Sequence, residues 1–431
     1  MRKAAFYTLG CKVSQYETEA ISEAFRERGY EIGSFSERCD VYVINTCTVT
    51  AEADRKSRQI IRRAKKINPG AKVLVCGCYS QRSPDEVERI PDVDAVIGSA
   101  GKMELADIAE RLLSGAEREI RVTDIDEEPF EPMKITEGPR TRVYVKIEDG
   151  CECRCTYCAI PSARGKVRSK PREDVIAEVE ALSKSGVREI VLTGIETGSY
   201  GADFDFDYRL ADLIAELDER KSAEVIRLGS LAPELIGESF VNKTKGLSIL
   251  APHFHLSIQS GADNVLRGMK RRYSRKMALE NIRKIKEAFP RVTFTTDIMV
   301  GFPGETDADF QDSVSFLREV GFLDAHVFAY SKRKNTPAEK YPDQVPEDIK
   351  RKRSEELIRV ASEVREKVLS DIVLAGVALP TVFETCDGKW WQGHSDNFAS
   401  VRVKCEKDIH GERFSVKPIE VIDGIIYGEI I

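Results

Sequence analysis

The chain has 431 residues, of which 42% are hydrophobic and 32% charged, and its formal net charge is −6. At a typical size of about 150 residues per domain, this length predicts about three globular domains. The negative charge excludes binding to nucleic acid through bulk charge, and no apolar run approaches the roughly 20 residues that cross a bilayer. The first residues contain too short an apolar stretch for a signal peptide, so we expect a cytoplasmic protein with no membrane partner.

The composition also includes eleven cysteines, a large number for an enzyme of a reducing compartment. In such a compartment, cysteines serve more often as metal ligands or catalytic groups than as disulfide partners. The odd number also argues against complete pairing. We therefore expect metal or thiol chemistry from this chain.

Residues 1–120 alternate short apolar segments with helical patterns and form the first predicted domain. Strands are predicted at 3–8, 41–45, 73–76 and 95–97, with helices at 15–28, 51–66 and 103–113. This alternation predicts a doubly wound parallel sheet with helices on both faces. An acidic stretch that contains proline, at 124–139, is predicted to be a linker.

A second alternation fills the next predicted domain, residues 138–368. Strands are predicted at 142–147, 188–192, 225–229, 253–258, 292–299 and 325–330, with helices that include 171–185, 274–288 and a charged helix at 347–369. This pattern predicts a partial (β/α)6 barrel, in which chemistry lies at the C-terminal ends of the strands. Residues 369–431 show short alternating strands and turns, which predict a small antiparallel β-barrel. The predicted fold class is therefore α/β, with these three units in chain order.

The strongest chemical signal is a group of cysteines just after the first barrel strand. Cys151, Cys155 and Cys158 have C-x3-C-x2-C spacing. Three thiolates can hold three irons of a [4Fe–4S] cluster and leave the fourth iron open. The alternative is a zinc site with a fourth ligand elsewhere in the chain. Cys153 also lies in this loop, and we expect it to be a bystander.

Three further cysteines each follow a predicted strand of the first domain: Cys11, Cys47 and Cys78. The C-terminal ends of parallel strands converge on one edge of a doubly wound sheet. The three thiols can therefore meet in space and hold a second cluster, although a single such cysteine is more often a small buried apolar residue.

The cysteine loop and the segment 155–169 resemble the radical S-adenosylmethionine (SAM) superfamily and, within it, the methylthiotransferases. The resemblance covers essentially the whole chain, and it implies SAM and two [4Fe–4S] clusters as cofactors. Cys151, Cys155 and Cys158 would hold the catalytic cluster, and Cys11, Cys47 and Cys78 the auxiliary one. In this family, one SAM methylates a sulfur at the auxiliary cluster, and a second SAM yields a radical that removes hydrogen from C2 of an adenine. The methylthio group then moves to that carbon, which is chemistry that only cofactors supply.

Residues at the predicted strand ends are candidates for binding SAM. Glu196 lies where the superfamily often has Gly-Glu-Glu, which here is Gly194-Ile195-Glu196. Polar residues at later strand ends are candidates for the carboxylate and ribose of SAM. Each is explained equally well as a strand-end residue that satisfies local backbone groups. The full set of candidates is Tyr157, Gly194, Glu196, Ser230, Gln259 and Asp297.

The resemblance also implies that the C-terminal barrel is a TRAM-like RNA-binding module. Residues 368–431 nevertheless contain six Lys or Arg against ten Asp or Glu, so this barrel is acidic. Stacking by Trp390, Trp391 or Phe398 could contribute to RNA contact. Basic runs lie elsewhere, at 55–66, 332–334, 350–353 and 164–172. We expect the last of these to hold RNA phosphates, because it borders the predicted active site.

The segment 12–19, just after Cys11, is similar to the MtaB group of this family, which modifies N6-threonylcarbamoyladenosine in tRNA next to the anticodon, at position 37. That resemblance implies tRNA as a partner, together with sulfur and electron donors that the sequence does not identify. The alternatives are isopentenyl-adenosine in tRNA, an aspartate of a ribosomal protein, and a non-catalytic RNA-binding protein with structural metal sites.

Overall fold

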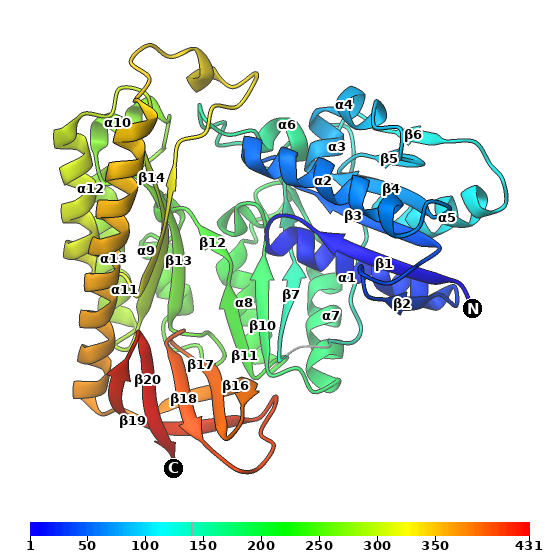
Figure 1. Ribbon diagram of the computed structural model, residues 1–431. Helices are drawn as coiled ribbons and strands as arrows, with labels where there is room; N and C mark the ends of the chain where they lie inside the picture. Colours follow the sequence, from blue (N-terminus) through cyan, green and yellow to red (C-terminus); the bar gives the residue numbers. More distant parts are fainter. Residues whose placement is uncertain (139–140) are drawn as a thin grey trace.

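A computed structural model describes residues 1–138 and 141–431 (Figure 1). The first unit is a parallel sheet with strand order β2-β1-β3-β4-β5-β6. Its strands are β1 (Lys3–Thr8), β2 (Glu31–Gly33), β3 (Val41–Thr46), β4 (Lys72–Gly77), β5 (Ala95–Ile97) and β6 (Glu119–Arg121). Its helices are α1 (Lys12–Glu27), α2 (Ala51–Ile67), α3 (Cys78–Arg82), α4 (Pro84–Glu88) and α5 (Leu105–Leu113).

Helices cover both faces of this sheet, as predicted for a doubly wound fold. Residues of α1 and α5, such as Phe25 and Leu105, share one apolar core with Val43 and Leu74. Residues of α2, such as Ile61, share a second core with the alternate strand residues on the other face. Because side chains alternate along a strand, a strand buried on both faces is apolar throughout, which explains the uninterrupted Val41–Thr46 run.

The second unit is a half-open barrel of parallel strands, which confirms the predicted (β/α)6 architecture (Figure 1). Its strands are β7 (Arg142–Lys146), β10 (Glu189–Thr193), β11 (Val225–Leu228), β12 (Ser230–Leu231), β13 (His253–Gln259), β14 (Thr293–Val300) and β15 (Asp324–Ala329). Its helices are α7 (Arg172–Lys184), α8 (Leu210–Glu219), α9 (Glu238–Thr244), α10 (Asp263–Gly268), α11 (Arg275–Ala288), α12 (Asp307–Val320) and α13 (Glu347–Ala375).

The sheet of the half-barrel is interrupted at Gly229, between β11 and β12. A Cβ at this position would lie 2.7 Å from the Thr197 hydroxyl and 3.1 Å from the Leu192 carbonyl oxygen. Only glycine allows this close approach, and Gly229 is the residue between the two short strands β11 and β12.

The third unit is a closed barrel with strand order β16-β17-β18-β20-β19. The strands are β16 (Leu379–Asp387), β17 (Trp390–Ser395), β18 (Ser400–Lys404), β19 (Arg413–Ile422) and β20 (Ile425–Ile430). The predicted barrel is confirmed, but its pairing is not purely antiparallel, since β18 and β20 run parallel. The turn 395–398 lies against the half-barrel, where Arg227 donates hydrogen bonds to the carbonyl oxygens of Ser395 and Asp396.

The stretch predicted as a linker packs against the half-barrel. Met133 and Ile135 are buried in its core, so residues 124–138 form part of the packed structure. Pro139, the last residue of that predicted linker, lies outside the described residues. The short pair β8 (Glu148–Asp149) and β9 (Arg168–Ser169), and the helix α6 (Ile160–Arg164), were not predicted, and they frame the cysteine loop. Within the described residues, no helix has both the length and the apolar character that crossing a membrane requires.

Candidate active site

The three N-terminal cysteines lie at the C-terminal ends of three adjacent strands. Cys11 is the N-cap of α1 after β1, Cys47 follows β3, and Cys78 is the first residue of α3 after β4. Gly10, with φ of +118°, brings the first loop so close that an added Cβ would lie 3.2 Å from Cys47 Cβ. The strand order therefore brings these thiols together at one edge, as the sequence predicted.

The electrostatic environment of these thiols affects their pKa values. Burial raises the pKa of the Cys47 thiol to about 12, and the neighbouring Cys78 and Cys11 add to the shift. Burial also raises the pKa of Cys78, while Arg164 opposes the shift, since its Nε lies 3.1 Å from Cys78 Sγ as a hydrogen-bond donor. Arg164 therefore supplies positive charge beside one of these thiols, which favours its thiolate form.

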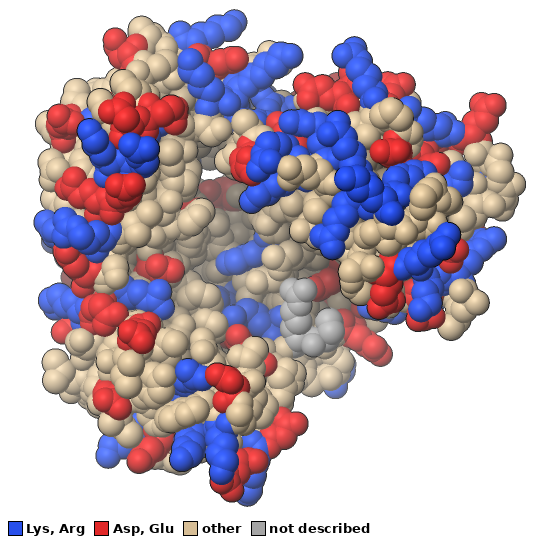
Figure 2. Space-filling model, in the orientation of Figure 1, with Lys and Arg blue, Asp and Glu red and all other residues tan. Residues whose placement is uncertain are grey.

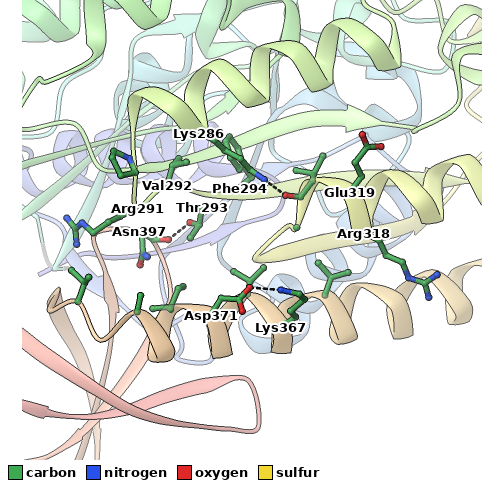
Figure 3. A pocket seen from close by; sticks show the side chains of 18 of the residues that line it. Lys286, Arg291, Val292, Thr293, Phe294, Arg318, Glu319, Lys367, Asp371 and Asn397 are labelled. Carbon is green, nitrogen blue, oxygen red and sulfur yellow. Dashed lines mark hydrogen bonds and ion pairs between the residues drawn. The ribbon is translucent and has the colours of Figure 1, made fainter.

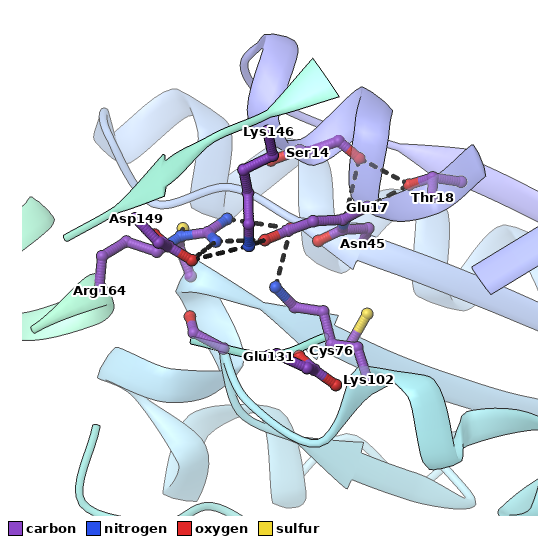
Figure 4. A network of polar contacts seen from close by, with 12 residues as sticks. Ser14, Glu17, Thr18, Asn45, Cys76, Lys102, Glu131, Lys146, Asp149 and Arg164 are labelled. Carbon is purple, nitrogen blue, oxygen red and sulfur yellow. Dashed lines mark hydrogen bonds and ion pairs between the residues drawn. The ribbon is translucent and has the colours of Figure 1, made fainter. Parts of the chain in front are cut away.

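Arg164 belongs to a buried ion network between the first sheet and the half-barrel (Figure 4). Glu17 of α1 accepts hydrogen bonds from both terminal nitrogens of Arg164, and Lys102 and Lys146 lie 2.8 and 3.1 Å away. Asp149, two residues before Cys151, accepts from Lys146 at 2.9 Å and from Arg164 at 3.1 Å. The network thus links a residue of the N-terminal cysteine edge to the start of the second cysteine loop.

The basic run 164–172 does not form the RNA-binding patch that was predicted from the sequence. Arg164, Arg168 and Lys170 are buried, with exposures of 0%, 7% and 3%. Lys170 pairs with Glu178 and donates to the carbonyl oxygen of Met133. The prediction was wrong for these three residues because their charges are neutralised inside the protein.

The second cysteine loop is held from both sides. Gly150 has φ of +88°, and a Cβ there would overlap the carbonyl of Lys166. The backbone N–H of Cys151 donates to Gly165 O at 2.9 Å, and Thr156 donates to the carbonyl oxygens of Met269 and Gly268. These contacts place the loop at the C-terminal end of β7, where barrel chemistry occurs.

Hydrogen-bond donors point at the sulfur atoms of this loop. Arg271 Nη1 lies 3.4 Å from Cys155 Sγ, and the N–H of Ile160 lies 3.4 Å from Cys158 Sγ. Burial raises the pKa of Cys158 to about 12. Donors to sulfur stabilise the charged form of a thiolate and tune the potential of a cluster that the thiolates bind. Arg271 was not recognised from the sequence, and nothing in its local pattern would have indicated this contact.

Cys153, which we expect from the sequence to be a bystander, contacts Cys151. Its thiol and that of Cys151 are hydrogen-bonded, which lowers the pKa of Cys153 to about 6, with a contribution from Arg271, and raises that of Cys151. Among the described residues, no group of three or more His, Cys, Asp or Glu side chains is arranged to hold a metal ion.

The predicted SAM residues divide into two groups, of which the first surrounds Glu196. Glu196 is 5% exposed, and burial raises its pKa to about 8. Its carboxylate accepts from Ala232 N at 2.9 Å, and its own N–H donates to Glu148 at 3.0 Å. Gly194 lies against Glu148, where a Cβ would overlap the carboxylate. Glu148 and Glu234 were missed, and each has one buried carboxylate oxygen without a hydrogen-bond partner among the described residues.

The remaining predicted residues lie at separate places along the barrel. Tyr157 stands edge-to-face against Phe302, Ser230 begins β12, and Gln259 ends β13 with φ of +64°. Asp297 does not sit at a strand end as predicted, because β14 continues to Val300. Its carboxylate instead pairs with His255 and His326.

The inner face of the half-barrel is polar. Phe254, Leu256 and Ile258 of β13 enter the apolar core, so the alternate residues His253, His255 and Ser257 face the inside. The molecule is hollowed between the half-barrel and the N-terminal sheet, and Lys or Arg side chains are visible within the hollow (Figure 2).

A separate cavity of about 710 Å³ lies between α11, α12 and α13, near the start of β14 (Figure 3). Its polar contacts include Lys367 with Asp371 and Lys286 with the carbonyl oxygen of Val320. Because it is lined by the first residues of β14, the cavity lies at the N-terminal ends of the strands. Conserved features at that end of a barrel generally serve stability. The cysteine loops lie at the opposite ends, and we assign no chemistry to this cavity.

The aromatic residues of the C-terminal barrel differ in their accessibility. Trp391 is 7% exposed and belongs to the barrel core, whereas Trp390 is 37% exposed. Phe398 stacks on His253 at a ring-centroid distance of 4.5 Å and lies beneath the Arg227 guanidinium. Phe398 therefore closes the lower end of the half-barrel, and Trp390 is the more accessible ring for stacking. Lys and Arg side chains gather on the outer face of α2 (Figure 2).

Comparisons with known proteins agree with this geometry. The model of the Radical SAM superfamily matches residues 145–317, and that of "Uncharacterized protein family UPF0004" matches residues 3–98. A solved structure of the radical SAM methyltransferase TsrM from Kitasatospora setae has a TM-score of 0.57 at 15% identity, over 79% of this chain and 77% of that one, which shows a shared fold. The chain therefore has the sequence and fold of a radical SAM enzyme.

Curated relatives define the family more closely. The threonylcarbamoyladenosine tRNA methylthiotransferase MtaB of Bacillus subtilis is 39% identical over 100% of this chain and 96% of its own length. MtaB of Aquifex aeolicus is 40% identical over 85% of this chain and 88% of its own length. The tRNA-2-methylthio-N(6)-dimethylallyladenosine synthase of Desulfitobacterium hafniense is 35% identical over 83% of this chain and 81% of its own length. The chain belongs to the radical SAM methylthiotransferase family, and membership implies SAM and a [4Fe–4S] cluster as cofactors.

Proposed function

We propose that this protein is a tRNA methylthiotransferase that adds a methylthio group to C2 of N6-threonylcarbamoyladenosine at position 37, next to the anticodon. The observation that carries the proposal is the 37–40% identity to three proteins named MtaB. Relatives named for dimethylallyladenosine are 31–35% identical. A reaction on tRNA takes place in the cytoplasm, and the protein's further partners are a sulfur donor and an electron donor.

Cys151, Cys155 and Cys158 would hold the catalytic cluster and leave one iron open for SAM. Thr156 fixes the loop against the turn at Gly268 and Met269, and Arg271 donates toward Cys155. When bound, the cluster and SAM supply the radical chemistry that breaks the C2–H bond. The residues of the chain bind and orient the reactants and exclude water from the site.

The SAM pocket would be built around Glu196, which Glu148 positions through the backbone N–H of residue 196. A buried carboxylate is suited to binding the methionine ammonium group, because the pair neutralises both charges. Gly194 lets the chain pass Glu148 without overlap. Tyr157, Ser230 and Gln259 complete the proposed pocket, whereas the pairing of Asp297 with two histidines favours a role on the inner wall.

Cys11, Cys47 and Cys78 would hold a second [4Fe–4S] cluster that carries the methylthio sulfur. Their convergence at one sheet edge and the donor Nε of Arg164 support this assignment. Because the trio belongs to a different sheet from the catalytic loop, the two clusters can be removed separately.

Cluster content tests the two assignments. Anaerobically reconstituted protein should hold about eight irons, and either triple Cys→Ala variant should hold about four. Full iron content in the Cys11/Cys47/Cys78 variant would contradict the second site. A zinc-only preparation without iron or sulfide would instead support a non-catalytic RNA-binding protein.

Nucleoside analysis tests the reaction. tRNA from a deletion strain should lack the 2-methylthio form of threonylcarbamoyladenosine and keep the unmethylthiolated nucleoside. Loss of methylthio-dimethylallyladenosine, or of methylthio-aspartate in a ribosomal protein, would assign the protein to one of the alternative substrates. In vitro, the Cys11/Cys47/Cys78 variant should still form 5′-deoxyadenosine from SAM but yield no methylthiolated tRNA. Continued methylthiolation without these cysteines would refute the mechanism.

A further inference from the structure

The segment that joins β15 to α13 contacts both cysteine sites. Residues 331–341, which we call the bridging segment, belong to this connection at the top of the molecule in Figure 1. The backbone N–H of Ala338 donates to the carbonyl oxygen of Thr156, inside the second cysteine loop, at 2.9 Å. Ala338 is fully buried in an apolar cluster with Met269 and Phe302. One part of the bridging segment is therefore packed onto the catalytic cysteine loop.

Arg333 extends from the bridging segment to the N-terminal sheet. Its Nη2 donates to the Thr48 hydroxyl at 2.8 Å and to the Asp54 carboxylate at 2.7 Å. Thr48 directly follows Cys47 and is fully buried, and Asp54 lies in the first turn of α2. Arg333 is itself only 5% exposed, although it belongs to a basic run of the sequence. Its guanidinium therefore holds the chain just after Cys47 from the side of the half-barrel.

The position of Arg333 is also fixed within its own segment. Thr336 donates to the carbonyl oxygen of Arg333 from its hydroxyl at 2.7 Å and from its backbone N–H at 3.1 Å, which closes a turn. Arg82, the last residue of the helix that begins at Cys78, donates to the carbonyl oxygen of Lys334. The bridging segment thus contacts the chain that follows two of the three N-terminal cysteines, as well as the catalytic loop.

These contacts bear on two sites that act together under the proposed function. A group transfer is sensitive to displacement, and a misplacement of about 1 Å can slow it about 100-fold. The ion network of Glu17 joins the same two units through α1 and Asp149, whereas Arg333 joins them through the loop after Cys47. Arg333 is therefore placed to control the position of that loop.

We infer that Arg333 is a positioning residue that couples radical formation to methylthio transfer. By holding Thr48 and Asp54, it fixes the loop of the auxiliary cysteines relative to the catalytic cysteine loop. The inference rests on the proposed function and concerns how its two sites are aligned. Loss of the guanidinium should leave SAM cleavage intact, because the catalytic loop keeps its own contacts with Gly165 and Gly268, and should reduce the transfer.

The first test measures both products in one reaction. Cluster-loaded protein receives SAM, a reductant and a tRNA anticodon stem-loop with threonylcarbamoyladenosine, and 5′-deoxyadenosine and methylthiolated RNA are quantified per iron-loaded protein. Arg333→Met should raise the ratio of 5′-deoxyadenosine to methylthiolated RNA about tenfold or more. Arg333→Lys should restore part of the coupling, because an ammonium group can still pair with Asp54. Asp54→Asn should also raise the ratio, and the double variant should add little, since both changes remove the same contact.

The second test measures the loop without the reaction. In cluster-loaded protein without RNA, amide hydrogen exchange at residues 47–54 should be about fivefold faster or more in Arg333→Met, because the loop opens more often. Exchange in β3 and β4 should be unchanged. Thr48→Val removes only one acceptor, so it should give a smaller change in both tests, and it decides the question if Arg333→Met does not retain its iron.

Arg318→Met is the matched control for both tests. Arg318 pairs with Glu363 between α12 and α13, but 55% of its side chain is exposed and it lies at the cavity far from the cysteine loops. This variant should change neither the product ratio nor the exchange at residues 47–54. An equal change in Arg318→Met would show that the effect is not specific to Arg333.

Three results would overturn the inference. An unchanged ratio in Arg333→Met with full iron content would do so, as would an equal fall of both products, which is the effect of general destabilisation. A loss of RNA affinity of about tenfold at an unchanged ratio would make Arg333 an RNA contact instead. Failure of the proposed function is distinct, because the wild type itself would then form no methylthiolated RNA. Even in that case, unchanged exchange at residues 47–54 in Arg333→Met would exclude the positioning role.

Discussion

Replacing Glu17 by Gln should destabilise the protein strongly, although the two side chains have nearly the same shape. Glu17 is fully buried and contacts three cations, Arg164, Lys102 and Lys146. Burial alone would raise its pKa, but these cations hold the pKa of Glu17 well below its usual value. Removal of the charge leaves Arg164 and Lys146 with Asp149 as their carboxylate partner and takes from Lys102 the carboxylate with which it pairs. Breaking a buried pair in this way costs about 3–5 kcal/mol.

Calorimetry of cluster-loaded protein, with iron content measured in parallel, would test this expectation. Glu31→Gln is the matched control, because Glu31 pairs with Lys3 at 2.7 Å while 44% of its side chain is exposed. An exposed pair contributes less than about 1 kcal/mol, so this variant should unfold almost as wild type does. A cost below about 1 kcal/mol for Glu17→Gln, in protein with full iron content, would refute the view that this network joins the two sheets.

Other predictions concern the loop, the lower end of the barrel and the RNA surface. Cys153→Ser should keep iron content and SAM cleavage while Cys151→Ser should abolish cleavage; the reverse result would make Cys153 the ligand. The pKa of Glu189 is about 2, because Arg227 and Arg142 outweigh burial. This lowered pKa contributes about 3 kcal/mol to the free energy of unfolding. The contribution should be complete above pH 4.5 and disappear as the pH falls toward 2. In unfolding curves measured over this pH range, Glu189→Gln should lack this part of the acid dependence. Neutralising the exposed Lys56, Arg62 and Lys66 of α2 should weaken tRNA binding. The slope of the logarithm of the binding constant against the logarithm of salt concentration should become less steep by roughly two to three. An unchanged slope would exclude α2 from the interface.

Much of the fold could be predicted because each parallel strand is an apolar run that ends at glycine or polar residues. The strands β1 and β5 have the predicted bounds, and most others differ by one or two residues. The meeting of Cys11, Cys47 and Cys78 also followed from sequence, since it requires only that their strands be neighbours in a parallel sheet. The break at Gly229 could not be predicted, because it depends on contact with Thr197 across the sheet.

The charged residues of the site were much harder to predict. Arg164 and Lys170 looked like a phosphate-binding run, yet their partners Glu17 and Glu178 come from other helices, and Glu17 is almost 150 positions away in the chain. Local sequence reports a charge but not its partner. For the same reason Glu196 could be predicted from its place at a strand end, whereas Arg271 could not, because its contact with Cys155 exists only in the folded chain.

The position of the turn 395–398 determines how the activity of a protein without its C-terminal barrel should be interpreted. Phe398 and the carbonyl oxygens of Ser395 and Asp396 contact Arg227 at the lower end of the half-barrel. Deleting the C-terminal barrel would therefore remove two hydrogen-bond acceptors and an aromatic ring from the buried Arg227, leave it with Glu189, and open the catalytic unit to water from below. Inactivity of such a truncation would be no measure of RNA binding. Trp390→Ala, which alters an exposed ring and leaves the turn in place, separates the two effects.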